Sequence, residues 1–128
     1  MPVKDGVYLA HENYPQTFTE RNRDHPSMLA NMGVLPGAGV DRDVIRRTHD
    51  KVIREWKWPD TWGWNYPIVA MTAAELRDAK LAIDVLLMKT SKNEYVAIGH
   101  NYQRPGFPAI RRATAACSRP SRRWVQRD

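Results

Sequence analysis

The sequence of 128 residues contains one cysteine, Cys117, and no apolar run that approaches the length of a membrane span. A single cysteine excludes an internal disulfide framework and a cysteine-based zinc site. A transmembrane helix needs roughly 18 apolar residues in a row, so we expect no membrane-spanning segment and no membrane partner. The opening residues, Met1 to Asp5, lack the apolar stretch of a signal peptide, and localisation stays open.

Patterns typical of metal sites are missing as well. The histidines are too far apart for metal-ligand spacing, and none belongs to an HExxH motif. They are His11, His25, His49 and His100. We therefore expect neither a metal nor a cofactor. The alternating apolar and polar residues of a β-strand are also lacking, so the predicted fold class is mainly α.

An excess of positive charge is confined to the C-terminal end. The net charge is +6, yet residues 1–110 contain 14 lysines and arginines against 13 acidic residues. Residues 111–128 contain six arginines and only one acidic residue, Asp128. This segment is either a basic arm that binds phosphates or a solvated tail without a partner.

Helices are predicted where apolar residues recur every three or four positions after a capping residue. Asp24 is placed to cap a short helix that has Pro26 in its first turn and Gly33 at its end. A helix over residues 42–57 follows, with Asp41 as its cap.

Two further helices are predicted over residues 68–78 and 81–88. The helix over 42–57 and the one over 68–78 form an αα-hairpin around an irregular aromatic segment. Residues 1–23 show no clear period and are expected to form a loop. One and a half hairpins of this kind are expected to make a poor core for an independent domain.

Tryptophan is concentrated in that aromatic segment. Four of the five tryptophans lie within nine residues, namely Trp56, Trp58, Trp62 and Trp64. Such a cluster has two physical uses. The rings can bury a large area and hold a hairpin connection together. They can instead form an apolar platform for the C–H face of a sugar, whose hydroxyls would bond nearby Asp60, Asn65 and His100-Asn101.

Each polar candidate also has a structural interpretation. Asp24 is suited to capping a helix, and His25 to bonding a neighbouring carbonyl. Asp60 is typical of a turn cap, and Asn65 can be structural. His100-Asn101 is the most suggestive pair, because polar side chains follow a glycine there.

Several segments, taken in order, resemble the C-terminal part of the catalytic domain of bacterial six-hairpin (α/α)6-barrel glycosidases, similar to glycoside hydrolase families 95 and 65. The resemblance covers about residues 2–106. Its segments are Asp24–Pro26, Trp58–Pro67, Ala70–Ala74, Asn93–Tyr95 and Gly99–Gln103.

The resemblance implies a partial (α/α)6 barrel of helical hairpins with long loops over residues 1–107, and a pocket that binds an oligosaccharide. The substrate-binding residues it implies are Asp24, His25, Trp62, Trp64, Asn65, His100 and Asn101. The parent activity would be hydrolysis of O-glycosyl bonds, which needs two carboxylates at a fixed separation. The general acid of such enzymes lies on an earlier hairpin, outside this chain. We therefore assign no catalytic residue and expect the chain alone to be inactive.

The resemblance stops where the composition changes, near Gly106–Ala109. Residues 108–128 are expected to be disordered. The codons for Arg111–Ala115, shifted by one base, can encode the Gly-Gly-Leu-Leu found in relatives, which suggests that the tail is out of frame. Two alternatives stay open: a small stand-alone carbohydrate-binding protein that uses the tryptophan cluster, and nucleic-acid binding through the tail, which is the less favoured of the two.

Overall fold

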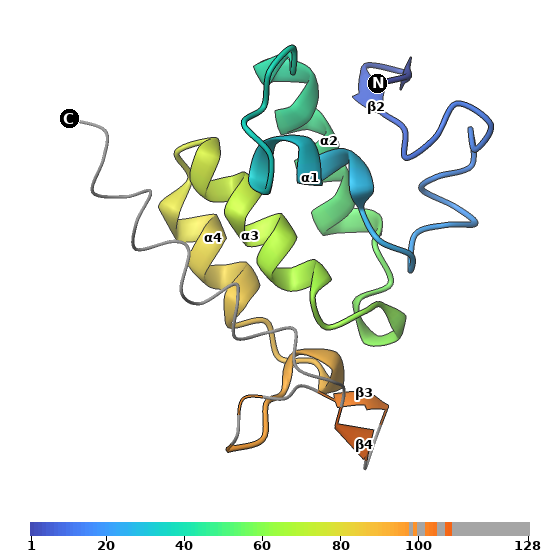
Figure 1. Ribbon diagram of the computed structural model, residues 1–128. Coiled ribbons are helices and arrows are strands. Elements are labelled where there is room, and N and C mark those ends of the chain that lie inside the picture. The colour runs from blue at the N-terminus through green and yellow to red at the C-terminus, as the bar shows by residue number, and fades with distance from the viewer. Residues whose placement is uncertain (98, 100–101, 105–106, 109–128) are drawn as a thin grey trace.

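The computed structural model describes residues 1–97, 99, 102–104 and 107–108, and α-helices are the main regular structure of that part (Figure 1). The predicted mainly α class is therefore confirmed for the described residues. In chain order the elements are β1 (Val3–Lys4), β2 (Val7–Tyr8), α1 (Ser27–Gly33), α2 (Arg42–Glu55), the 3-10 helix η1 (Trp58–Asp60), α3 (Asn65–Glu75), α4 (Ala79–Leu86), the 3-10 helix η2 (Ser91–Asn93), β3 (Tyr102–Arg104) and β4 (Phe107–Pro108). The tail predicted to be disordered is residues 108–128; Pro108 belongs to β4, and residues 109–128 lie outside the described part.

Helix α2 begins at the cap that the sequence predicts. The carboxylate of Asp41 accepts hydrogen bonds from the backbone amides of Asp43, at 2.9 Å, and Val44, at 3.0 Å. These two bonds stabilise the charged carboxylate and lower the pKa of Asp41. The helix ends at Glu55, where Trp56 turns to an extended conformation.

Asp24 does not cap α1, contrary to the prediction. The helix begins at Ser27 with Pro26 as its N-cap residue, and no side chain caps it. Asp24 lies two positions further back, and its carboxylate forms an exposed ion pair with Arg21 at 3.6 Å.

Helices α3 and α4 each begin earlier than predicted. α3 starts at Asn65, so Pro67 occupies its first turn. Proline is tolerated there because backbone amides of the first turn have no partner within the helix, so its missing N–H is not needed. α3 ends before Arg77, which adopts a left-handed conformation with φ of 63°. Asp78, predicted to be the last residue of α3, instead caps α4 by accepting from the amide of Leu81 at 2.9 Å.

A short hairpin replaces part of the predicted N-terminal loop. β1 and β2 pair antiparallel across Asp5-Gly6, and both turn residues have positive φ, as a type I′ turn requires. The guanidinium of Arg47 on α2 donates to the carbonyl of Gly6 at 3.0 Å. The hairpin is thereby attached to α2.

The core lies around α3, which contacts both α1 and α4 and lies between them in Figure 1. The hydroxyl of Thr72 on α3 donates to backbone carbonyls, and Leu29 on α1 is one of its partners at 3.0 Å. At this crossing, a Cβ built on Gly33 would come within 2.6 Å of the Thr72 hydroxyl oxygen and 2.8 Å of the Ile68 carbonyl oxygen. The missing side chain of Gly33 therefore sets how closely α1 and α3 approach.

His49 is the buried histidine of this core, with 1% of its surface exposed. Its Nε2–H donates to the carbonyl of Val69 at 3.1 Å, which joins α2 to α3. Burial disfavours the imidazolium and lowers the pKa of His49 below its ordinary value of 6.5.

Candidate functional site

The tryptophan cluster divides into a buried pair and an exposed pair. Trp56 and Trp58 are 4% and 8% exposed, whereas Trp62 and Trp64 are 45% and 36% exposed. The indole of Trp58 also lies against the Tyr66 ring, with 5.1 Å between centroids. One pair of tryptophans therefore packs in the core, and the other pair is exposed at the surface.

His25 lies against both exposed tryptophans. Its ring centroid is 5.5 Å from that of Trp62 and 4.5 Å from that of Trp64, the second contact being edge-to-face. The three rings come from two parts of the chain, the segment before α1 and the segment that leads into α3. We call this set of three side chains the aromatic surface.

The side chain of Asn65 forms a hydrogen bond with the ring of His25. The Asn65 amide nitrogen donates to the carbonyl of Asp24 at 3.0 Å and also to the Thr61 hydroxyl. A carbonyl can only accept, so this end of the amide is the nitrogen, and the oxygen must be the atom 2.8 Å from Nδ1 of His25. Nδ1 therefore donates. In neutral His25 the other nitrogen, Nε2, is a hydrogen-bond acceptor directed away from Asn65.

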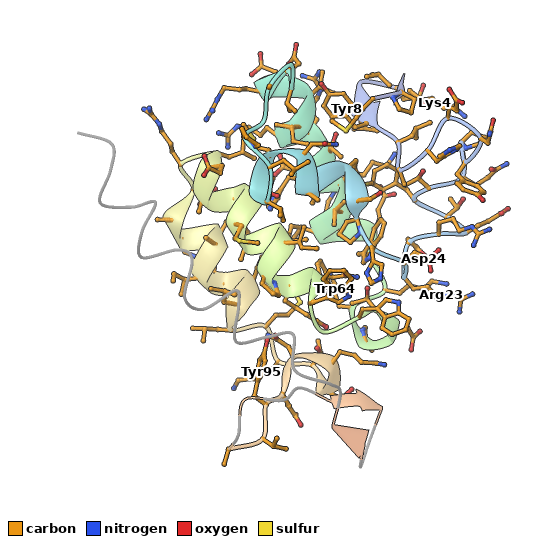
Figure 2. The ribbon with its side chains drawn as sticks, in the orientation of Figure 1. Lys4, Tyr8, Arg23, Asp24, Trp64 and Tyr95 are labelled. Carbon is orange, nitrogen blue, oxygen red and sulfur yellow. The ribbon has the colours of Figure 1, made fainter. Side chains whose placement is uncertain are left out.

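The backbone before His25 is also fixed in place. Trp56 Nε1–H donates to the carbonyl of Asp24 at 3.0 Å, and the hydroxyl of Thr61 donates to the carbonyl of Arg23 at 3.0 Å. The amide of Asn22 donates to the carbonyl of Glu55 at the end of α2, at 2.8 Å. Figure 2 shows the result, with Asp24 and Trp64 near each other where the N-terminal segment meets the start of α3.

A small open pocket of about 200 Å³ adjoins the aromatic surface. It is lined by Ala10, His11, Tyr14, Arg21, Asp24, His25 and Ser27. The Arg21 guanidinium lies 4.9 Å from the centroid of the Tyr14 ring, and both members of the ion pair between Arg21 and Asp24 line the pocket. We call this the Tyr14 pocket. His25 belongs both to it and to the aromatic surface.

Five of the seven predicted site residues come together here. Asp24 and His25 line the Tyr14 pocket, and Trp62 and Trp64 contact His25. Asn65 is fully buried and takes part by positioning His25. The remaining two, His100 and Asn101, lie outside the described residues.

Sequence reasoning missed His11, Tyr14 and Arg21. They lie in the segment read as a loop without a period, where nothing indicates which side chains face one another. The only local signal is the presence of an aromatic and a basic residue there, and their contact depends on how residues 10–24 turn back on themselves.

Within the described part of the chain, no group of three or more His, Cys, Asp or Glu residues is arranged to hold a metal ion. No helix in that part is both long and apolar enough to cross a membrane. No protein-family model, curated protein or solved structure matches this chain.

Proposed function

We propose that this chain binds an oligosaccharide at the aromatic surface, as the sugar-binding part of a six-hairpin glycosidase-like domain. The observation that carries the proposal is the exposure of Trp62 and Trp64, together with the contact that each makes with His25. The same tryptophans belong to the segment on which the resemblance to these glycosidases rests.

The chemistry of the aromatic surface suits a sugar. A pyranose ring has an apolar face of C–H groups that stacks on indole, and a rim of hydroxyls that need hydrogen-bonding partners. Trp62 and Trp64 offer the apolar contact, and the ring of His25 lies against both of them. Because Asn65 fixes the orientation of the His25 ring, the sugar would meet a preorganised group.

The finer fold assignment belongs to the same proposal. Two features support a partial (α/α)6 barrel, namely that α3 and α4 are consecutive helices joined by a short turn and that they pack against each other. Hydrolysis would need a second carboxylate opposite the first. Within the described part of the chain, Asp24 is the one carboxylate that lines the Tyr14 pocket. The chain by itself would therefore bind the sugar without cleaving it.

The proposal is tested by titrating the full chain with neutral oligosaccharides, the cello- and malto- series, in a calorimeter. Loss of a stacking ring costs about 1–2 kcal/mol, so Trp62→Ala and Trp64→Ala should each weaken binding roughly tenfold. Leu87→Ala is the matched control, since Leu87 is an apolar side chain on the surface, 72% exposed, just after α4. The proposal is wrong if the wild-type chain binds none of these sugars, or if the double tryptophan variant binds as the wild type does.

A further inference from the structure

The polar side chains that line the Tyr14 pocket offer both hydrogen-bond donors and hydrogen-bond acceptors. The Arg21 guanidinium offers donors, and the Asp24 carboxylate offers acceptors. The two histidines add one of each kind. Nδ1 of His11 accepts from the amide of Asn13 at 3.1 Å, so neutral His11 has its hydrogen on Nε2 and offers a donor. In neutral His25, Nδ1 donates to Asn65, so Nε2 is the ring atom that can accept a hydrogen bond.

This combination of hydrogen-bond donors and acceptors matches a ligand with adjacent hydroxyl groups. Each hydroxyl of a vicinal diol donates one hydrogen bond and accepts others, so a diol uses donors and acceptors together. A carboxylate or sulfate would only accept, and it would lie beside the negative charge of Asp24. Among the described residues that line the pocket, the one arginine or lysine is Arg21, and it already has Asp24 as its ion-pair partner. The pocket therefore favours a neutral ligand rich in hydroxyls.

The Tyr14 ring gives the pocket an apolar wall. It is 45% exposed, and its contacts with the Arg21 guanidinium, at 4.9 Å, and with the His11 ring, at 5.4 Å, hold it in place. Arg21 and Asp24 keep 51% and 54% of their side-chain surface exposed. Their polar groups are therefore accessible to a ligand without a rearrangement of the core.

We propose that the Tyr14 pocket is a second saccharide subsite, which takes a neutral sugar unit through adjacent hydroxyls while the neighbouring unit stacks on Trp62 and Trp64. This inference rests on the proposed function, because the aromatic surface supplies the first subsite. His25 lines the pocket and touches both tryptophans, so the two subsites share a residue and are adjacent. The ligand is then an oligosaccharide of neutral units rather than a monosaccharide.

The test compares affinity with chain length in the full-length protein. Calorimetric titrations use the monosaccharide, disaccharide and trisaccharide of the cello- and malto- series, with oligogalacturonides as the acidic counterpart. We expect wild-type affinity to rise at least tenfold from the monosaccharide to the trisaccharide in one neutral series. Arg21→Ala and Asp24→Ala should each remove this rise, and Arg21→Ala should leave monosaccharide binding within twofold of the wild type.

Arg23→Ala is the matched control, because Arg23 is a neighbouring exposed arginine that does not line the pocket. It should keep the dependence on chain length. The subsite is refuted if the Arg21 and Asp24 variants also keep the dependence of affinity on chain length. It is refuted as well if oligogalacturonides bind more tightly than the neutral series. A loss of binding in the tryptophan variants, without an effect of Arg21→Ala, would refute the subsite alone. Absence of all saccharide binding would refute the proposed function as well.

Discussion

Trp56 and Asn65 donate hydrogen bonds to the same acceptor, the backbone carbonyl oxygen of Asp24, each at 3.0 Å. One donor comes from the end of α2 and the other from the first residue of α3. A single peptide group therefore joins these two helices to the segment before α1. His25 follows directly, so its position is set by the same two bonds.

Replacing Asn65 by aspartate should destabilise the fold. A carboxylate cannot donate, so the carbonyl of Asp24 would face a second acceptor in a buried place. An unsatisfied buried group of this kind costs about 1–3 kcal/mol, and more when it is charged. Urea unfolding followed by tryptophan fluorescence measures the change. Asn13→Asp, at an exposed position, is the control and should leave the midpoint unchanged. Equal midpoints for the Asn65 variant and the wild type would contradict this account.

The two kinds of tryptophan should differ in their effect on stability. Trp56→Ala removes a buried ring from the core and should lower the free energy of unfolding by about 3–5 kcal/mol. Trp62→Ala truncates a half-exposed ring and should change it by less than about 1 kcal/mol. Thermal unfolding followed by circular dichroism measures both. Similar losses in the two variants would show that Trp62 also belongs to the core.

Stability should fall as the pH drops below about 6.5, because of His49. Burial lowers its pKa in the folded state, so the unfolded chain binds more protons between that lowered value and 6.5. The free energy of unfolding therefore declines as the pH falls through this window and is fully retained above it. Urea unfolding between pH 5 and 7 measures the free energy of unfolding at each pH. This free energy should depend less steeply on pH in His49→Gln than in the wild type. Identical slopes would assign the pH dependence to other groups.

Gly33→Ala should destabilise the packing of α1 on α3, although alanine favours helices. The new methyl group would meet the hydroxyl oxygen of Thr72 at 2.6 Å and the carbonyl oxygen of Ile68 at 2.8 Å. Overpacking of this kind costs about 1–3 kcal/mol. Thermal denaturation should therefore show a lower midpoint, and a higher one would mean that the helices move apart without loss.

The sequence predicts the helices better than their ends. Apolar spacing and the cap at Asp41 place α2 correctly, because both signals are local. The start of α3 is missed because Pro67 is tolerated within a first turn as well as before it. The hairpin at Asp5-Gly6 carries its own turn signal, yet its strands are too short to show a period.

The site is predictable only in part. The tryptophan cluster marks the region, but the spacing does not separate Trp56 from Trp62, because the segment between them is not a regular helix. Whether a tryptophan in this segment is exposed depends on whether its indole N–H reaches a buried carbonyl. That in turn depends on the tertiary structure. The contact of Tyr14 with Arg21 is likewise tertiary, since it is formed by a loop with no regular period.

The segment from Leu9 to Asp24 is held at both ends. The amide of Leu9 donates to the carbonyl of Pro2 at 2.9 Å, and the carbonyl of Asp24 is the acceptor shared by α2 and α3. Within the segment, the hydroxyl of Thr17 donates to the carbonyl of Tyr14 at 2.7 Å. Fixing a backbone costs about 1–2 kcal/mol of conformational entropy per residue, and this chain loses that entropy when it folds. The saccharide proposed to enter beside Tyr14 would therefore meet a loop that is already ordered, and its affinity would not be reduced by having to order it.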